Sequence, residues 1–211
     1  MSQDVQAVDA VMTLAPVIPV LILDDPETAL AIGRALVAGG LPALEVTLRT
    51  PRALDCLKAL STLPGAVAGA GTVLNAGQAE AARAAGARFM VSPGATPALV
   101  AAVEATGVPL LPGVGTASEL MAMLERGYER LKFFPAETSG GAAQLKAFAS
   151  PFGRVRFCPT GGIDAAKAPT YLGLTNVACV GGSWVTPADA VAARDWDRIE
   201  ALARAAARLR A

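Results

Sequence analysis

Short apolar runs alternate along this chain with alanine-rich stretches. The runs are continuous and β-branched, as in parallel strands covered on both faces, whereas apolar positions in the alanine-rich stretches recur with a helical period. Proline opens the helix expected at 26–38, and Thr50 can cap the next one. The expected strands are 17–23, 43–48, 66–70, 88–91, 108–111, 130–134, 155–158 and 177–180. The expected helices between them are 26–38, 51–60, 76–85, 97–105, 117–125 and 141–149.

This alternation predicts an α/β fold with parallel strands. A doubly wound open sheet and a closed (β/α)8 barrel, or TIM barrel, both satisfy it. The strand count and the length of 211 residues favour the barrel, with 5–14 and 196–209 as additional terminal helices. No linker composition or low-complexity tract divides the chain, so we expect a single domain over residues 1–211.

The amino-acid composition argues against several classes of function. The 18 basic and 18 acidic residues balance and no basic cluster occurs, so a nucleic-acid partner is not expected. The apolar stretches 10–23 and 168–188 are interrupted by proline or glycine, which argues against a membrane span. The first residues lack the charged and apolar pattern of a signal peptide, and we therefore expect the protein in the cytoplasm.

The residue types that are scarce here constrain the chemistry. Histidine is absent, which removes the commonest general base and the commonest transition-metal ligand. Cys56, Cys158 and Cys179 lie far apart without metal-site spacing, and are most simply buried thiols. Catalysis would have to use carboxylate, lysine or hydroxyl groups.

Lys132 is the first candidate for such chemistry, because it stands inside an otherwise apolar, β-prone run. Burial disfavours the charged form of an amine and leaves more of it as a neutral nucleophile that can attack a carbonyl. The alternative is a lysine at a strand end, with its stem packed on Phe133 and its head in water.

Glu45, Thr47 and Arg49 alternate with apolar residues, so a strand would send all three side chains to one face. In a barrel that face is the interior. A Glu–Arg pair there could be purely structural. The functional interpretation makes Glu45 a proton shuttle and Arg49 a bidentate clamp for a carboxylate.

Polar and glycine residues gather where the expected strands end, which is the ligand-binding face of a barrel. Glycines after the last two strands could let backbone N–H groups approach an anion, helped by a helix opening near Asp164, although tight turns also use glycine for conformation alone. The turn 69–72 lacks the spacing of a dinucleotide fingerprint. The residues at these ends are Glu45, Thr47, Arg49, Gly71, Thr72, Ser92, Pro93, Pro112, Gly113, Thr116, Lys132, Thr160, Gly161, Gly162, Gly181, Gly182 and Ser183.

Six segments together resemble the bacterial 2-keto-3-deoxy-6-phosphogluconate (KDPG) and 4-hydroxy-2-oxoglutarate (KHG) aldolase family. They occur in the family's order, and the likeness runs from about Val17 into the C-terminal helix. The segments are LEVTLRT at 44–50, GAGTVLN at 69–75, VSPG at 91–94, LKFFPAE at 131–137, RFCPTGGI at 156–163 and GGSW at 181–184.

The resemblance implies a class I aldolase without metal or cofactor: a (β/α)8 homotrimer that cleaves a phosphorylated sugar acid in Entner–Doudoroff-type catabolism. Lys132 would form a Schiff base with C2 of the keto acid, and Glu45 would move protons. Other positions would hold the substrate: Arg49 and Thr72 its carboxylate, Pro93 the adjoining pocket, and Gly161, Gly162, Gly182 and Ser183 its phosphate. Thr160 favours the gluconate over the galactonate series through the same resemblance.

The chain departs from the family pattern at one place, and three alternative functions fit the same residues. Asp24 and Asp25 follow the first strand, and no cation ends it, so a basic contribution from that strand is not expected. The first alternative is a phosphosugar isomerase or epimerase. The second is an aldolase acting on KHG or on the C4 epimer of the sugar acid, and the third is a non-catalytic phosphosugar-binding protein.

Overall fold

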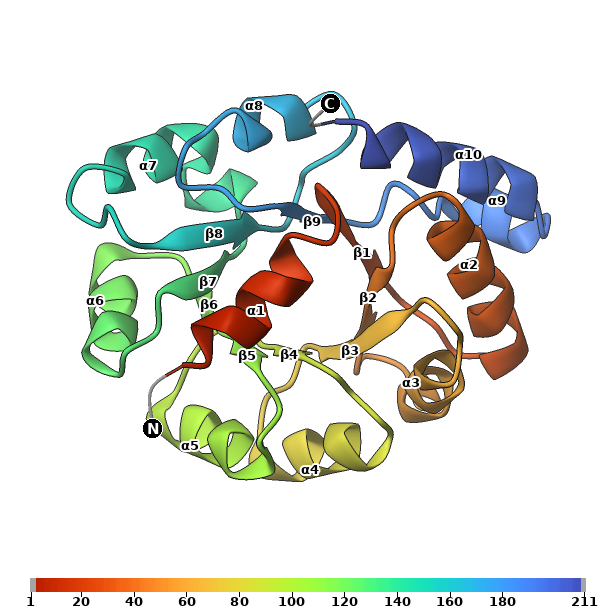
Figure 1. The fold of residues 1–211 in the computed structure, drawn as a ribbon, viewed down its shortest axis with the longest axis horizontal. Helices are drawn as coiled ribbons and strands as arrows, with labels where there is room; N and C mark the ends of the chain where they lie inside the picture. The colour runs from red at the N-terminus through yellow and green to blue at the C-terminus, as the bar shows by residue number, and fades with distance from the viewer. Residues whose placement is uncertain (1–2, 210–211) are drawn as a thin grey trace.

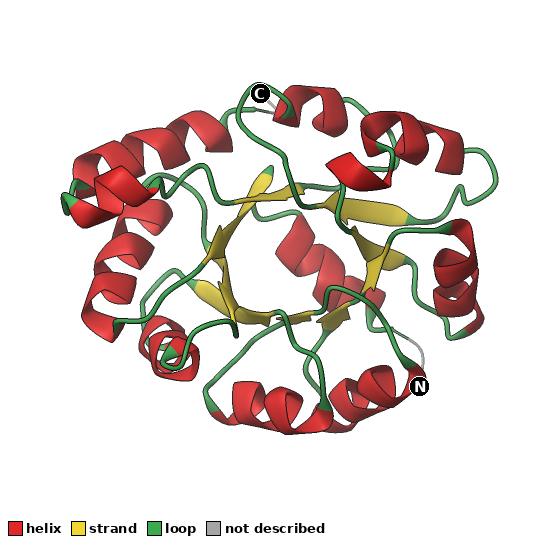
Figure 2. Cartoon of the chain, turned by 180° about the vertical axis from the view of Figure 1, so that it is seen from behind, coloured by secondary structure: helices red, strands yellow, loops and turns green. Residues whose placement is uncertain are grey.

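A ring of parallel strands with helices on its outside forms the centre of the molecule (Figures 1 and 2). This computed structural model describes residues 3–209. The strands are β1 Val17–Leu21, β2 Ala43–Thr47, β3 Val67–Gly71, β4 Met90–Val91, β5 Leu110–Leu111, β6 Gly113–Val114, β7 Arg130–Phe133, β8 Arg156–Pro159 and β9 Val180–Gly182. The parallel α/β architecture predicted from the sequence is confirmed.

The strands pair as two sheets. One is six-stranded in the order β5-β4-β3-β2-β1-β9, and the other is three-stranded in the order β6-β7-β8, with every pair parallel. Isolated bridges from Phe157 to Val177 and from Thr160 to Gly181 connect β8 with the chain around β9. These two bridges differ in register by one residue, which interrupts the ladder between them.

Most helices lie between successive strands in the chain and cover them from outside, whereas the first precedes β1 and the last two follow β9. Their bounds are α1 Val5–Met12, α2 Pro26–Ala38, α3 Ala53–Ser61, α4 Ala76–Ala84, α5 Pro97–Thr106, α6 Ala117–Glu125, α7 Gly141–Phe148, α8 Ala168–Leu172, α9 Ala188–Ala192 and α10 Trp196–Ala207, with a 3-10 turn η1 Glu137–Ser139. Within residues 3–209, no helix has the length and apolar character that crossing a bilayer requires.

Three expectations for these elements are wrong in detail. The strand expected at 108–111 is shortened to β5, and a second, unpredicted strand, β6, follows Pro112, which has no N–H to donate but whose carbonyl accepts from the Lys132 N–H. The strand expected at 177–180 forms mainly at Val180–Gly182. Thr50 does not cap α3, because its hydroxyl donates to the Leu23 carbonyl, and Arg52 takes the cap position without a side-chain hydrogen bond.

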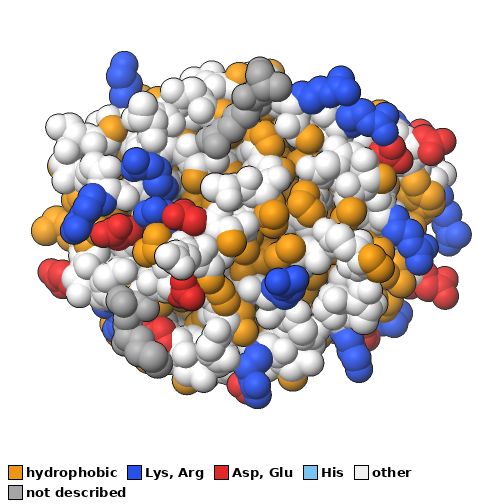
Figure 3. Space-filling model, in the orientation of Figure 1, with side chains coloured by type: hydrophobic (Ala, Val, Ile, Leu, Met, Phe, Trp, Pro, Cys, Tyr) orange, Lys and Arg blue, Asp and Glu red, His pale blue; other side chains and the backbone are white. Residues whose placement is uncertain are grey.

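Helix α1 closes the amino end of the ring from inside. Its buried Val8, Val11 and Met12 pack in one apolar cluster with Ile18, Phe89 and other residues facing the interior of the strands, separately from the larger core under the helices. Gln3 fastens the start of α1, donating to the carbonyls of Leu110 at 3.0 Å and Arg130 at 2.8 Å. Basic and acidic side chains intermingle around this face (Figure 3).

Candidate active site

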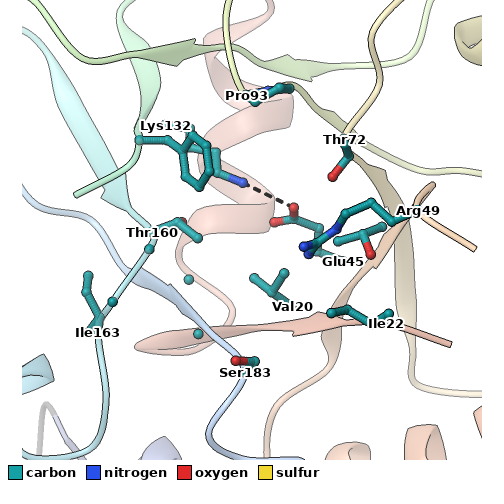
Figure 4. Close-up of a pocket in the computed structure, with 16 residues that line it drawn as sticks. Val20, Ile22, Glu45, Arg49, Thr72, Pro93, Lys132, Thr160, Ile163 and Ser183 are labelled. Atoms are coloured by element: carbon teal, nitrogen blue, oxygen red, sulfur yellow. Dashed lines mark hydrogen bonds and ion pairs between the residues drawn. The ribbon is translucent and has the colours of Figure 1, made fainter. Parts of the chain in front are cut away.

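A cavity of about 400 Å³ lies at the carboxyl ends of the strands (Figure 4). The catalytic and substrate-binding residues implied by the resemblance all line it, so the structure brings together segments that are far apart in the chain. Five other strand-end residues expected on this face do not line it: Gly71, Ser92, Pro112, Gly113 and Thr116. The lining residues are Val20, Ile22, Glu45, Thr47, Arg49, Thr72, Pro93, Lys132, Phe134, Thr160, Gly161, Gly162, Ile163, Gly181, Gly182 and Ser183.

Lys132 and Glu45 form a buried ion pair inside this cavity. The Lys132 Nζ lies 3.2 Å from Glu45 Oε1, and the residues are only 5% and 3% exposed. The same Nζ stands 5.1 Å from the centre of the Phe134 ring, a cation–π contact. The interpretation of Lys132 as a strand-end lysine reaching water is therefore wrong. Each charge offsets the cost of burying the other, and both atoms stand where a ligand could reach them.

Gly71 makes room for the Glu45 carboxylate. A Cβ at Gly71 would lie 2.3 Å from Glu45 Oε1 and 2.6 Å from its Cγ, closer than atoms can approach. The neighbouring Thr47 has another task, since its hydroxyl donates to the Leu21 carbonyl at 2.9 Å and ties β2 to β1. The Glu45 side chain is thus held between strand β3 on one side and Lys132 on the other.

Arg49 follows the end of β2 and points into the cavity from the side of Glu45 and Thr72 (Figure 4). The structural Glu45–Arg49 pair considered from the sequence is not formed, because Glu45 pairs with Lys132 instead. Arg49 has no ion-pair partner among residues 3–209. Its guanidinium is exposed and could hold an anionic ligand bidentately.

Thr72 adopts a left-handed backbone conformation, with φ of 60°. That conformation is unusual for a β-branched residue and costs free energy, so the surroundings must impose it. The Val73 N–H donates to the Val91 carbonyl at 3.1 Å, and the Leu74 N–H donates to Gln78 Oε1 at 2.7 Å. Strain at a residue that lines a cavity is typical of a binding site.

The other end of the cavity carries no charged side chain in its described wall. Gly161 and Gly162 have φ of 107° and 79°, so two successive residues take left-handed conformations that favour glycine. Gly181 packs on Thr160, where a Cβ would lie 2.3 Å from the hydroxyl oxygen. Gly182 and the exposed Ser183 complete this end.

The structure contradicts the expectation that a helix opens near Asp164. Asp164 Oδ1 accepts hydrogen bonds from the N–H groups of Ala166 and Lys167, each at 3.0 Å, and α8 begins only at Ala168. These N–H groups are therefore already satisfied within the turn. The expected contribution of a helix terminus to anion binding at Asp164 is wrong.

Sequence reasoning missed four apolar residues of the wall. Val20 and Ile22 lie on or just beyond β1, and Phe134 lies two residues after Lys132. The period of two along a strand could have placed Phe134 and Val20 on the interior face, whereas Ile163 lies in an irregular turn that offered no such signal. Ile22 is 59% exposed and forms part of the rim.

The acidic residues after β1 stay outside the wall. The Asp25 carboxylate accepts from the Thr28 N–H at 2.8 Å and caps α2, while Asp24 Oδ1 accepts from the Arg52 N–H at 3.0 Å. Neither repels an anion from within the cavity. Among the described residues, no group of three or more His, Cys, Asp or Glu side chains could hold a metal ion.

The geometry agrees with comparisons with known proteins. A profile of the KDPG and KHG aldolases matches residues 8–202. The KHG/KDPG aldolase of Escherichia coli is 51% identical over 200 residues, which cover 94% of this chain and 93% of that protein.

Two solved structures share the fold closely. The KDPG aldolase of Legionella pneumophila, crystallised with pyruvate captured as a covalent carbinolamine, has a TM-score of 0.91 and 48% identity, covering 94% of this chain and 97% of that one. The 2-keto-3-deoxy-6-phosphogluconate aldolase of Zymomonas mobilis has a TM-score of 0.92 and 52% identity, covering 96% and 97%.

Proposed function

The chain belongs to the KDPG and KHG aldolase family, and from this premise we propose that it is a class I aldolase cleaving KDPG to pyruvate and glyceraldehyde 3-phosphate. One observation carries the proposal: a buried lysine amine, 3.2 Å from a buried carboxylate, inside a cavity with a cationic end and a glycine-rich end. The carbinolamine captured in the Legionella pneumophila relative supports covalent chemistry of this type.

The first half of the reaction forms an imine. Glu45 Oε1 takes a proton from the Lys132 ammonium, and the neutral Nζ attacks the C2 carbonyl of the keto acid to give a carbinolamine. Glu45 returns the proton to the carbinolamine hydroxyl, which leaves as water. The product is a protonated imine that withdraws electrons from C3. The short distance between the two groups allows proton transfer without rearrangement.

The second half breaks the C3–C4 bond. Glu45 accepts the proton of the C4 hydroxyl, directly or through water, as the C3–C4 electron pair moves toward the imine nitrogen. The aldehyde product departs and leaves an enamine on Lys132. Glu45 then delivers the proton to C3, and addition of water to C2 releases pyruvate and restores the amine.

The two ends of the cavity would orient the substrate. Arg49 and the Thr72 hydroxyl stand on the side of Glu45 and would hold the substrate carboxylate, with Pro93 lining the same region. The phosphate would lie at the opposite end, against Thr160, Gly161, Gly162, Gly182 and Ser183, where glycine backbones permit close approach.

A trapping experiment tests this function. Borohydride added with pyruvate should reduce the imine and leave a stable adduct on the peptide containing Lys132, detectable by mass spectrometry. Lys132→Ala should form no adduct and release no pyruvate from KDPG. An adduct on another residue, or wild-type turnover by Lys132→Ala, contradicts the mechanism. A phosphosugar isomerase or a binding protein would form no such adduct.

KHG is the second candidate substrate, since relatives carry both activities in their names. The imine chemistry is the same, and glyoxylate replaces the phosphorylated aldehyde. The glycine-rich end would then stay empty, and we expect a lower kcat/KM for KHG than for KDPG. Measuring kcat/KM for the gluconate and galactonate epimers in the same way shows which of the two the enzyme prefers.

We further propose that the two sheets form one (β/α)8 barrel and that the chain assembles as a homotrimer. Support for the barrel comes from the segment around Pro112, which contributes β5 to one sheet and β6 to the other, and from the bridges linking β8 to the chain around β9. The trimer rests on family membership, and light scattering should give three times the mass of the chain.

A further inference from the structure

Three side chains outside the cavity wall meet behind the Gly161–Gly162 turn. The Lys167 Nζ lies 2.7 Å from Glu137 Oε2, and the Tyr171 hydroxyl donates to Glu137 Oε1. Tyr171 is 2% exposed, so its hydroxyl has little access to water, whereas the Lys167 side chain is 45% exposed. We name this cluster of Glu137, Lys167 and Tyr171 the loop clamp.

The loop clamp contacts the backbone of the turn directly. Lys167 Nζ donates to the Gly162 carbonyl at 2.9 Å, and the Glu137 N–H donates to the Gly161 carbonyl at 3.1 Å. The Glu137 side chain also packs on Gly162, where a Cβ would approach its Cγ to 2.7 Å. Both carbonyls of the turn are therefore held from outside the cavity.

Charge keeps the loop clamp assembled near neutral pH. Hydrogen bonds from Lys167 and then from Tyr171 hold the pKa of the Glu137 carboxyl below its ordinary range, and the carboxylate in turn raises the pKa of Lys167. Burial, reinforced by Glu137, raises the pKa of the Tyr171 hydroxyl, which therefore stays protonated and able to donate. All three groups keep the protonation states that the contacts require.

We propose that the loop clamp fixes the Gly161–Gly162 turn in its left-handed conformation and so prepares the phosphate end of the cavity for the substrate. This inference rests on the proposed function, which places the phosphate there. Two adjacent glycines have more conformational freedom than any other pair, and ordering them only on binding would weaken affinity. Glu137, Lys167 and Tyr171 are positioning residues, since none of them lines the cavity.

The test compares KDPG with its unphosphorylated analogue, 2-keto-3-deoxygluconate, as the ratio of their kcat/KM values. Lys167→Met and Glu137→Gln should each lower this ratio about tenfold, mainly through a higher KM for KDPG, because preorganisation acts on binding. Tyr171→Phe should act in the same direction. Lys167→Arg keeps the cation and should preserve most of the ratio. Borohydride trapping of pyruvate on Lys132 should proceed at the wild-type rate in all four variants.

Glu80→Gln is the matched control, because it removes an exposed ion pair with Arg83 on α4, among residues that do not line the cavity. It should leave the ratio unchanged. Thermal unfolding would verify that each variant is folded. An unchanged ratio in both Lys167→Met and Glu137→Gln would overturn the loop clamp, and so would an equal loss for both substrates. Failure of pyruvate trapping in the unaltered protein would instead refute the proposed function.

Discussion

The Lys132 Nζ lies 3.2 Å from Glu45 Oε1, although the two residues are separated by 87 positions in the chain. Lys132 stands on β7 and Glu45 on β2, and these strands belong to different sheets. The ion pair therefore spans the space enclosed by the strands. Both groups are buried, so removing either one would leave the other as an uncompensated charge inside the protein.

Glu45→Gln should reduce kcat for KDPG by about 10²- to 10⁴-fold, the usual contribution of a positioned acid–base group. The amide keeps the size of the side chain but cannot take the proton from Lys132 or from the C4 hydroxyl. Imine trapping with pyruvate should persist at a slower rate. Steady-state turnover and borohydride trapping measure the two effects, and unchanged turnover would exclude the proton-transfer role of Glu45.

Gly71→Ala should lower kcat by about 10²-fold, as displacements near 1 Å at a reacting centre can do. The added Cβ would lie 2.3 Å from Glu45 Oε1, so the carboxylate must move relative to Lys132. Gly153→Ala is the control, since its Cβ would meet only the Ala149 carbonyl oxygen at 3.9 Å. If Gly71→Ala retains wild-type kcat, the position of the carboxylate is not critical.

Thr72→Gly should separate stability from binding. Glycine relieves the left-handed strain at φ of 60° but loosens the unfolded chain, so we expect the free energy of unfolding to stay equal or rise by up to about 1 kcal/mol. Loss of the hydroxyl should raise KM for the keto acid. Urea unfolding and pyruvate trapping at varied pyruvate concentration measure these changes. A clear loss of stability would show that the strain at Thr72 is smaller than the cost of the more flexible unfolded chain and the lost side-chain contacts.

Glu137 should make part of the stability depend on pH. Its pKa in the folded protein is below the ordinary value of 4.5, so its contribution is present above that value and is lost as the pH falls through the folded-state pKa. The wild type should exceed Glu137→Gln in stability at about pH 6, and the difference should shrink toward about pH 3. Urea midpoints at the two pH values report it, and a constant difference would argue against an ionised Glu137.

The site residues were predicted from the sequence more accurately than the bounds of the helices and strands. The alternation of side chains along a strand predicted that Glu45 and Thr47 face the interior. The rule that binding residues lie at the carboxyl ends of parallel strands placed Lys132 near them. Both rules depend only on backbone geometry. Arg49 shows the limit of the alternation: β2 ends at Thr47, and the arginine lies beyond the ladder in a turn.

Helices α8 and α9 and strand β6 escaped prediction because they are too brief to carry a period. Helices α8 and α9 are five residues each, and β6 is two residues long, whereas β5 lies within the strand expected at 108–111. Pro112 marks the division between β5 and β6, but an X-Pro pair alone does not tell whether the strand ends or resumes.

The loop clamp could not be predicted from local sequence. Glu137 belongs to the recognised segment 131–137, but its partners lie about thirty residues further on, in a stretch for which only a helix opening near Asp164 was expected. Tyr171, an aromatic residue with a polar tip, offered only a general expectation of a buried hydrogen bond. Long-range side-chain pairing needs the three-dimensional structure.

Helix α1 covers the amino end of the space that the strands surround. Val8, Val11 and Met12 pack across the amino end of the strands. A ligand therefore reaches Lys132 from the opposite end, where Ile22 and Ser183 are exposed. The covalent link to Lys132 imposes an order of departure: the aldehyde leaves once the C3–C4 bond breaks, whereas the three-carbon acid stays attached until water releases it. In the reverse, condensing direction, pyruvate has to form its imine with Lys132 before the aldehyde can react.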